Sequence, residues 1–592
     1  MDVESLFSDG LHYHLEGRID SAENLYREVL KKNPKHVNAL HHLGLIHLQL
    51  GLVSQAIAEI RSSLVLDPSQ PDALANLGHC LNIIGDHLGA CESCKAALEI
   101  DPRNDGAWTN LGNAQRGLKL AADARRSYER ALDLHPSNPR YIYNVGLTFF
   151  DQEQFEEAGE RFQRCLSIQP RVPEAHNNSA VCLLKLQNPL LALHHADTAV
   201  QLKPDYAEAW SNRGNALHDL RRHEEALASY DRSIELKPDY AEAWSNRGNT
   251  LNVLRQHVEA LASYDRSIEL KPDYGDAYWN KSLDLLRIGD FDQGWQLYEW
   301  RWRYDKFTST QRHFSQPLWL GDTPLEGRTL LLHSEQGYGD SIQFCRYTRL
   351  VKRLGAKVVL EVEPPLVELF TTLEGVDEVV GKGKMLSDFD YHCPLLSLPL
   401  ALKTVVATIP HDVPYLHVSR AKREQWTRHL SLSRDKPSVG IVWSGDPKHK
   451  NDHNRSIRLE TMRKVFSEKL NWFCLQRDVL QEDRPFLEAA GIRDHTAKLK
   501  DFSDTAGLIS HLDLVISVDT SVAHLAGALG KPVWVLLPYV PDFRWMWDRE
   551  DSPWYPSMRL FRQSTGGDWD TVISRINQEL TCCKFSTNVG ES

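Results

Sequence analysis

The sequence lacks three features that would each point to a class of protein. No stretch supplies the ~18 uninterrupted apolar residues of a membrane span, because Asp519, His524 and Lys531 interrupt the longest run. The formal net charge is −12, which argues against a broad surface for nucleic acid or anionic membrane. The opening residues, MDVESLFSDGLHYHLEG, have no basic segment followed by an apolar one, so we expect no secretory signal. The sequence therefore predicts a soluble, cytoplasmic protein.

Cysteine is also scarce, with ten in 592 residues. Cys80 and Cys165 lie inside helical patterns and have the spacing of small buried hydrophobic residues, not of a disulfide framework. Cys91 and Cys94 form a Cys-x-x-Cys pair, but no second pair supplies further zinc ligands. We therefore expect no metal site and no other cofactor. A chain of this length is too long for one hydrophobic core, so at least two domains are expected.

A proline recurs every 34 residues through the first half of the chain. This is the period of a helix–turn–helix solenoid, and it is kept without a slip by Pro34, Pro68, Pro102, Pro136, Pro170, Pro204, Pro238 and Pro272. Small residues recur where two helices must approach closely: Gly44, Gly78, Gly112, Gly146, Gly214 and Gly248, and Ala22, Ala56, Ala90, Ala124, Ala158, Ala192, Ala226 and Ala260. Large residues follow these alanines by four positions, as Tyr26, Tyr128, Phe162, Tyr230 and Tyr264 do, and are expected to fill the gap one turn on.

This pattern resembles the tetratricopeptide repeat (TPR) family over residues 3–305. Eight full repeats are followed by a degenerate ninth, in which Ser282 and Gly294 replace the expected Gly and Ala. The ninth repeat runs into GWQLYEWRWR (294–303), whose tryptophans we expect to cap the solenoid against the next domain. Repeats 205–238 and 239–272 are nearly identical, which indicates a recent duplication.

An asparagine also recurs at the same period. A primary amide carries a donor and an acceptor, so a row of them suits an extended polypeptide held by its backbone. Asparagine at this place is also common in the general TPR pattern, where it ties neighbouring repeats together, and both interpretations stay open. The candidate peptide-binding ladder is Asn76, Asn110, Asn144, Asn178, Asn212, Asn246 and Asn280.

After about residue 313 the repeat gives way to short apolar runs that alternate with helical stretches. RTLLLHSE (328–335), AKVVLEVE (356–363), SVGIVW (438–443), NWFCLQ (471–476), LDLVISV (512–518) and PVWVLL (532–537) predict strands, and SIQFCRYTRLVKRLG (341–355) predicts a helix closed by Gly355. The alternation predicts parallel sheets covered by helices. A break at ATIPHDVPYLHVSR (407–420) divides the region into halves at 313–413 and 414–580 that would face each other across a cleft.

The stretch SVDTSVAHLAGALG (517–530) follows one of these strands. Ligands bind beyond the carboxyl ends of parallel strands, and a helix that starts at Asp519 or Thr520 would direct the free amides of Thr520, Ser521 and Val522 at a phosphate. His524 lies one turn further and can face the same cleft. An ordinary capped helix with a buried histidine is the alternative.

Asp519-Thr520-x-x-x-His524-Leu525, followed by Ala528-Leu529-Gly530-Lys531-Pro532, resembles the donor-site signature of the heptosyltransferase-type (family 9) glycosyltransferases. The resemblance implies the two-domain GT-B fold over about 320–575, with a donor half (414–580) that holds the phosphates of a nucleotide-diphosphate sugar and an acceptor half (313–413). Ser521 stands where many family members have glycine, which would either keep the backbone further from the phosphate or replace an amide contact with a hydroxyl contact.

The stretch HSEQGYGDS (333–341) matches the family's Gly-Asp motif, which implies that Asp340 is the general base. It is not a dinucleotide-binding fingerprint, because Ile342 occupies the third glycine position. Capping of the helix start is the alternative role for Asp340.

The loop WSGDPKHKNDHNRS (443–456) offers Ser444 and Arg455 as further donor ligands, and Arg455 could neutralise a leaving diphosphate. Lys448 and Lys450 add charge, although a solvated loop is the default for such a run. The loop is too irregular to fix His449, Asp452 and His453 as metal ligands. PDFRWMWDRED (541–551) is interpreted as either a lid over the cleft or packing against the first half.

These patterns predict a bacterial-type, inverting and metal-independent GT-B glycosyltransferase whose TPR array binds a polypeptide acceptor or partner. The combination also resembles the architecture of TPR-containing protein O-glycosyltransferases. One alternative is a TPR scaffold with an inactive GT-B domain, and another is transfer to a lipid-linked or polysaccharide acceptor. Asp340, Thr520 and His524 facing one cleft would favour the enzyme.

Overall fold

The computed structural model describes residues 2–430, 436–447 and 451–582. The chain divides into two compact units, Met1–Thr250 and Leu251–Ser592, and each is described by itself. The domain borders predicted near residues 305, 313 and 413 stay predictions. No helix in the described part of the chain is both long and apolar enough to span a bilayer.

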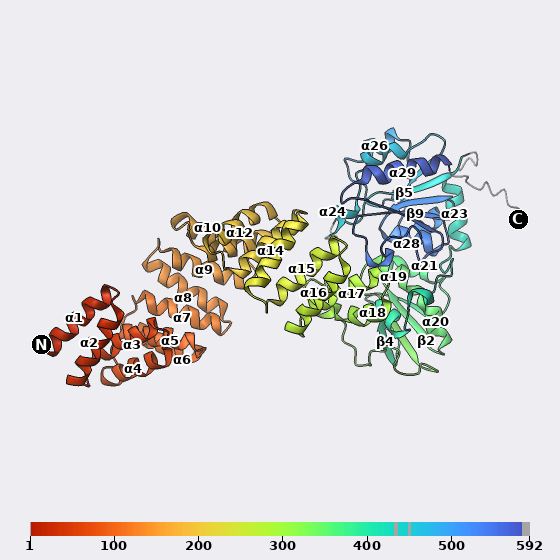
Figure 1. The fold of residues 1–592 in the computed structure, drawn as a ribbon. Helices are drawn as coiled ribbons and strands as arrows, with labels where there is room; N and C mark the ends of the chain where they lie inside the picture. Colours follow the sequence, from red (N-terminus) through yellow and green to blue (C-terminus); the bar gives the residue numbers. More distant parts are fainter. Residues whose placement is uncertain (1, 431–435, 448–450, 583–592) are drawn as a thin grey trace. The chain divides into compact units, whose positions relative to one another are not determined.

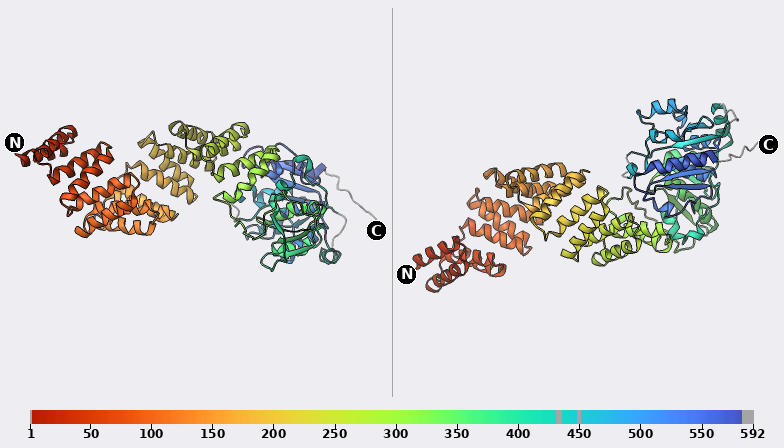
Figure 2. Two further views of the ribbon diagram at one scale, coloured as in Figure 1. Left: turned by 90° about the horizontal axis from the view of Figure 1, so that it is seen from below. Right: turned by 45° about the horizontal axis from the view of Figure 1, so that its top comes forward.

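The first unit consists of consecutive helices that pack in pairs (Figure 1). Figure 2 shows the same helix pairs from two further directions. The helices are α1 (Val3–Leu15), α2 (Ile19–Lys32), α3 (Val37–Gln49), α4 (Val53–Leu66), α5 (Pro71–Ile83), α6 (His87–Ile100), α7 (Asp105–Gly117), α8 (Ala121–Leu134), α9 (Pro139–Asp151), α10 (Phe155–Ile168), α11 (Pro173–Lys185), α12 (Pro189–Leu202), α13 (Ala207–Asp219), α14 (His223–Leu236) and α15 (Ala241–Val253), whose last residues belong to the second unit. The predicted all-helical TPR solenoid is confirmed.

Several helix pairs close where a glycine of the first helix faces a large side chain of the second. A Cβ on Gly112 would lie 2.5 Å from Cε1 of Tyr128, and one on Gly214 would lie 2.6 Å from Cε1 of Tyr230. Both tyrosines are only 1 % exposed. The recurrent alanines of the second helices are fully buried as well. The aromatic ring therefore fills the space that the missing Cβ leaves, as the sequence pattern predicts.

The second unit begins with the last helices of the repeat array: α16 (His257–Leu270), α17 (Gly275–Ile288) and α18 (Phe291–Tyr298), followed by the 3-10 helix η1 (Glu299–Arg303). Trp295 packs edge to face on Phe344 and Phe543 of the α/β region, with ring centroids 6.2 and 5.7 Å away. Trp300 instead stacks on Tyr278 of α17. The capping role predicted for these tryptophans is therefore filled by Trp295.

The α/β region contains two parallel sheets. The first has the order β3-β2-β1-β4 and the second the order β10-β9-β8-β5-β6-β7. Their strands are β1 (Thr329–His333), β2 (Lys357–Val362), β3 (Glu378–Gly381), β4 (Tyr391–Pro394), β5 (Ser438–Val442), β6 (Asn471–Cys474), β7 (Arg493–Asp494), β8 (Leu514–Val518), β9 (Val533–Leu537) and β10 (Met558–Arg562). Two parallel sheets with helices between the strands confirm the predicted α/β fold class, which is that of a GT-B domain.

Helices and 3-10 turns connect the strands. The helices are α19 (Tyr338–Phe344), α20 (Thr348–Arg353), α21 (Val367–Phe370), α22 (Leu398–Ala401), α23 (Arg420–Leu430), α24 (Asp452–Arg455), α25 (Leu459–Met462), α26 (Arg484–Ala489), α27 (Phe502–Ile509), α28 (Ser521–Ala528) and α29 (Trp569–Cys582). The 3-10 helices are η2 (Cys345–Tyr347), η3 (Pro364–Leu366), η4 (Leu395–Ser397), η5 (Val406–Thr408), η6 (Arg463–Val465), η7 (Thr496–Lys498) and η8 (Phe543–Trp545).

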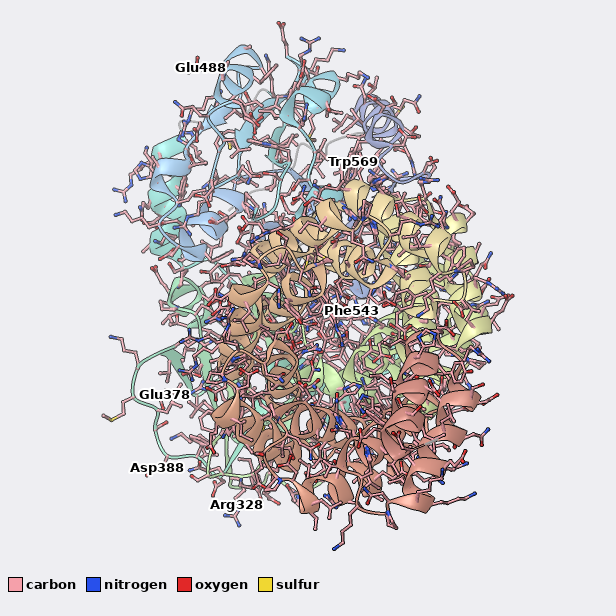
Figure 3. The ribbon with its side chains drawn as sticks, turned by 90° about the vertical axis from the view of Figure 1, so that its left-hand side faces the viewer. Arg328, Glu378, Asp388, Glu488, Phe543 and Trp569 are labelled. Carbon is pink, nitrogen blue, oxygen red and sulfur yellow. The ribbon has the colours of Figure 1, made fainter. Side chains whose placement is uncertain are left out.

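The second sheet is buried on both faces. Val515, Val533 and Val535 belong to one apolar cluster, which continues into the first sheet, and Ile516 and Trp534 belong to another on the opposite face. Figure 3 labels Glu488 and Trp569 in the half that holds this sheet, Arg328, Glu378 and Asp388 in the other half, and Phe543 of η8 between them.

The helix predicted for 341–355 is divided in two. Its middle, Cys345–Tyr347, is a 3-10 turn, and the buried Arg346 there donates from Nε to the carbonyl of Gln343 at 2.8 Å and from Nη2 to the hydroxyl of Tyr415 at 2.9 Å. The helical stretch ends at Arg353, and Gly355 adopts φ +85°, so the predicted glycine stop is confirmed.

Gly146→Ala tests the glycine–aromatic packing. The new Cβ would lie 2.8 Å from Cε1 of Phe162, which is fully buried and cannot move aside, so we expect a loss of about 1–3 kcal/mol in local stability. Gly159→Ala is the matched control on the partner helix, because its Cβ would meet only Cβ of Cys182 at 3.9 Å, and alanine favours the helix by up to ~1 kcal/mol. Hydrogen exchange of α9 and α10 in the full chain measures both. Equal protection in the two variants would contradict the packing argument.

Candidate functional site

The order of the second sheet places its ligand-binding edge between β5 and β8. The chain runs from β5 outward through β6 and β7, and then returns to the other side of β5 for β8, β9 and β10. The carboxyl ends of β5 and β8 are neighbours, with Val442 opposite Ser517. A change of direction of this kind opens a crevice beyond the strand ends. Ser444, which follows β5, and Asp519 and Thr520, which follow β8, therefore lie at the same edge.

The helix start at α28 has the geometry that an anion requires. Thr520 is the N-cap residue, but its hydroxyl does not cap the helix and lies 3.1 Å from the hydroxyl of Ser517. Within the described residues, no hydrogen bond occupies the amides of Ser521 and Val522. Free amides and the helix dipole at this end favour negative charge. The predicted phosphate-binding role of Thr520 and Ser521 fits this geometry and stays a prediction.

His524 is buried beside this helix start. Its Nδ1 lies 3.0 Å from the Tyr555 hydroxyl, and its ring stacks on Trp545 with centroids 5.3 Å apart. Burial, together with the nearby Arg544 guanidinium, lowers the pKa of His524 to about 3. The imidazole is therefore uncharged near neutral pH, and it can offer a ligand a hydrogen bond but no positive charge.

The two predicted motifs meet at Gly339. A Cβ on Gly339 would lie 3.0 Å from Cδ2 of His524 and 3.5 Å from Cα of Ser521. The start of α19 in the first half thus packs directly against the start of α28 in the second half. Any residue larger than glycine at position 339 would separate them. The contact at Gly339 therefore brings the neighbouring Asp340 close to α28, which carries His524, and that Asp340, Thr520 and His524 serve one site stays a prediction.

Asp340 fills one of its two proposed roles in the structure, the capping of the helix start, and its role as general base stays a prediction. One carboxylate oxygen accepts the backbone N–H of Gly337 at 2.8 Å, which caps the first turn of α19. The other oxygen is paired with the Arg544 guanidinium. Burial raises the pKa of Asp340, and Arg544 opposes that rise by stabilising the carboxylate.

Arg544 is a candidate site residue that the sequence interpretation missed. Its side chain is 9 % exposed and reaches three groups: Asp340, Gln343 through Nε at 2.6 Å, and Asp542 through Nη1 at 2.8 Å. The stretch 541–551 therefore packs against the first half, which is one of its two predicted roles. The signal available in the sequence was the position of Arg544 between two aromatic residues, Phe543 and Trp545, with Asp542 just before them.

Arg455 completes the charged groups at this edge. Its Nη1 donates to the backbone carbonyl of Asp519 at 3.1 Å, and its Nε donates to Asp452 at 3.2 Å. Ser444 lies nearby on the β5 side, with its amide bonded to Gln476 at 3.1 Å. Lys448, His449 and Lys450 lie outside the described residues.

Asp519 carries an acidic group into the same buried site. Burial is the main cause that raises its pKa, and the neighbouring Asp542 carboxylate adds to the rise. Its Oδ1 lies 4.0 Å from Nε2 of His524. In the described part of the chain, no group of three or more His, Cys, Asp or Glu side chains is placed to hold a metal ion.

The asparagine ladder is engaged between repeats. Asn110 donates from Nδ2 to the carbonyl of Ala75 at 3.0 Å, and Asn212 donates to Oδ1 of Asn177 at 2.9 Å. Asn76, Asn178 and Asn246 likewise contact residues of the preceding repeat. Asn144 is 8 % exposed, and Asn280 lies half-buried in α17. These contacts fit the structural role of the ladder, and peptide binding by it stays a prediction.

Asp519→Asn tests the buried carboxyl. Because the pKa of Asp519 is raised in the folded chain, the stability that its proton provides is present at low pH and is lost as the pH rises through the folded-state pKa. Asparagine does not titrate, so the stability of the variant should rise relative to that of the unaltered protein as the pH increases from about 4 to about 6, the folded-state pKa of Asp519, by about 1.4 kcal/mol for each unit by which that pKa is raised. Hydrogen exchange of β8 and α28 measures this. Asp570→Asn, at an exposed position, is the control; a pH-independent difference for Asp519→Asn would refute the assignment.

Solved structures similar to this chain include TPR proteins. The crystal structure of YrrB, described as a TPR protein with an unusual peptide-binding site, is 26 % identical, covers 33 % of this chain and 100 % of that one, and has a TM-score of 0.28. PilF of Pseudomonas aeruginosa is 21 % identical over 36 % of this chain and 96 % of that one, with a TM-score of 0.33. A TPR protein from Parabacteroides merdae is 17 % identical over 42 % of this chain and 99 % of that one, with a TM-score of 0.35.

A curated relative is the protein FlbA of Caulobacter vibrioides. The two sequences are 27 % identical over 336 residues, which is 50 % of this chain and 53 % of FlbA. The chain thus spans about half the length of the curated relative that it matches.

Family models match both parts of the chain. Models described as tetratricopeptide repeat match residues 16–71, 71–104, 109–173, 143–207, 207–240 and 241–274. The model described as glycosyltransferase family 9 (heptosyltransferase) matches residues 497–546. That segment runs from α27 to η8 and contains Asp519, Thr520, His524 and Arg544. The chain therefore combines TPR repeats in its N-terminal half with a C-terminal segment that matches glycosyltransferase family 9.

Proposed function

We propose that the second unit transfers a glycosyl group from a nucleotide-diphosphate sugar to an acceptor hydroxyl. The observation that carries this proposal is the family 9 match at residues 497–546, which falls on the β8–α28 edge of the second sheet. The contacts of Gly339 and Arg544 support it further, because they bring Asp340 of the first half to that edge. A base and a phosphate-binding helix start then border one site.

In this proposal Asp340 accepts the proton of the acceptor hydroxyl. The acceptor oxygen forms a bond to the anomeric carbon, on the face opposite the nucleotide, and the bond from that carbon to the diphosphate oxygen breaks. The electron pair leaves on the diphosphate, so the configuration at the anomeric carbon is inverted. The Arg544 pairing favours the ionised form of Asp340 against the effect of burial, and only that form can accept a proton.

The departing diphosphate would be held by the start of α28. The amides of Thr520 and Ser521 and the guanidinium of Arg455 are the donors available for its growing negative charge. Ser444 is a further candidate contact at the end of β5. His524 would contribute as a neutral hydrogen-bonding group, since its pKa is about 3. With these groups carrying the charge, the proposal includes no metal ion or other cofactor.

TPR repeats are protein-interaction modules, so we assign a polypeptide partner or acceptor to the array.

Asn110→Ala distinguishes the two possible roles of the asparagine ladder, joining repeats and binding peptide. If the amide only joins repeats, the variant should lose about 1 kcal/mol of local stability and keep its partner. If the ladder binds peptide, affinity should fall in variants whose hydrogen-exchange protection is unchanged.

The competing function is a protein-binding scaffold whose GT-B domain is inactive. One observation favours it: both oxygens of Asp340 are already engaged, by Gly337 and by Arg544. Each carboxylate oxygen can accept a second hydrogen bond, so this engagement does not prevent base catalysis. Measurements of donor binding and of turnover distinguish the two functions.

Asp340→Asn is the central test of the enzyme proposal. The full-length protein is screened by thermal shift against UDP-, GDP-, ADP- and CMP-sugars, and nucleotide release is measured with the donor that binds. A donor at 100 times its Kd should stabilise its domain by about 2.7 kcal/mol. Asp340→Asn should keep this shift but lose about 10²–10⁴-fold in the rate of nucleotide release, because the base is gone.

Asp542→Asn is the matched control. It removes a different carboxylate from the same Arg544 guanidinium and leaves Asp340 in place, so nucleotide release should fall much less than in Asp340→Asn. Equal losses in the two variants would mean that the ion cluster, and not a base, is being measured. No thermal shift with any donor would favour the scaffold.

A further inference from the structure

A cavity lies in the first half of the α/β region, apart from the proposed donor site. It has a volume of about 210 Å³ and is bounded by Trp302, Gln311, Arg312, Phe314, His333 and His392, among others. The segment that follows η1 forms one wall, and the ends of β1 and β4 form the other. None of these residues belongs to the donor site proposed above.

The cavity lies where the strand order of the first sheet changes direction, between β1 and β4. The chain goes from β1 outward to β2 and β3 and then returns to the opposite side of β1 for β4. His333 is the last residue of β1 and lies opposite Pro394, the last residue of β4. Both of these residues line the cavity. The crevice between strands at such a reversal is where ligands bind in open parallel sheets.

The cavity is separated from Asp340 by the sheet itself. Leu330 and Leu332 of β1 pack in the same apolar cluster as Ile342 and Phe344 of α19, the helix that carries Asp340. Leu331 belongs to a cluster with Phe314 on the other face. His333 is two residues beyond Leu331 and shares its face, because side chains alternate along a strand. The cavity therefore lies across the sheet from the proposed catalytic site.

One buried polar atom in the cavity wall lacks a partner. His333 is 2 % exposed, and its Nε2 lies 3.3 Å from Nδ1 of His392. Its Nδ1 has no hydrogen-bond partner among the described residues. An unsatisfied buried nitrogen of this kind is costly. This nitrogen has almost no accessible surface, so a ligand pairs with it only when the His333 ring turns toward the cavity, and that pairing recovers the cost. A hydroxyl group suits either tautomer, because it both donates and accepts.

The remaining wall is aromatic and uncharged on balance. The Phe314 ring lies 4.7 Å from that of His392, and the Arg312 guanidinium lies over the Phe314 ring. Arg312 is neutralised by its ion pair with the buried Glu361. Burial lowers the pKa of His333 to about 3 and also lowers that of His392, so both imidazoles are neutral near pH 7. A neutral ligand fits this wall better than an anion.

We infer that this cavity binds a single neutral sugar ring. Its volume of about 210 Å³ lies below the ~300 Å³ at which pockets for drug-sized ligands begin, so a nucleotide sugar does not fit. Hydroxyl groups would pair with His333, and the apolar face of the sugar ring would lie on Trp302. The inference concerns binding alone and holds whether or not the other site transfers a glycosyl group.

Saturation-transfer NMR on the full-length protein tests the inference. The probes are the methyl glycosides of glucose, galactose, mannose and N-acetylglucosamine, each titrated with Trp302→Ala and Trp300→Ala as a matched pair. Trp302 lines the cavity, whereas Trp300 stacks on Tyr278 outside it. One glycoside should bind, Trp302→Ala should weaken it about tenfold, which corresponds to about 1.4 kcal/mol, and Trp300→Ala should leave it unchanged.

A second variant keeps the inference testable if Trp302→Ala does not fold. Gln311 is exposed at the cavity mouth, so Gln311→Trp fills the cavity without removing a buried contact, and it should abolish the saturation signal. Binding of the glycoside should persist when nucleotide sugar is added. No signal with any glycoside, equal weakening in both tryptophan variants, or displacement by nucleotide sugar would overturn the inference.

Discussion

The second unit depends on the burial of one positive charge, the guanidinium of Arg544. This group pairs with Asp340 of the first half and with Asp542 of its own segment, and it is hydrogen-bonded to Gln343. Removing one partner from a buried ion pair typically costs about 3–5 kcal/mol, because the other charge is left without compensation. The segment that carries Arg544 is therefore fixed against the first half, and with it the position of Asp340 beside α28.

The same cluster bears on the proposed donor binding, because the proposed site is rich in carboxylates and the donor is negatively charged. Asp340 and Asp542 share the charge of Arg544, and the backbone of Asp519 is held by Arg455. The raised pKa of Asp519 reduces the negative charge that this residue contributes. Arg544 and Arg455 thus offset part of the negative charge beside the free amides of α28, which favours the diphosphate proposed above.

Local patterns predicted most of the fold, because each depends on neighbours in sequence. The proline period gave the helix pairs, and the apolar runs gave six strands of the two sheets. β4 (YHCP) and β10 (MRLFR) were not predicted, since neither has a run of aliphatic residues. Asp340 and Thr520 were found through motifs. Arg544 was not, because its contact with Asp340 joins residues 204 positions apart, which no local pattern records.

The last repeat is continuous with the core of the α/β region in a way that its sequence period does not reveal. Trp295 and Tyr298 are buried in that core, and Arg301 is fully buried against Glu335, with its Nε 3.0 Å from the carboxylate. Arg287 of the same repeat donates to the carbonyl of Pro541 at 3.0 Å, close to Arg544. The end of the repeat pattern is thus not the end of the cooperative folding unit. A chain shortened to begin after the repeats would lose part of its own hydrophobic core and leave the Glu335 carboxylate buried without its counter-ion.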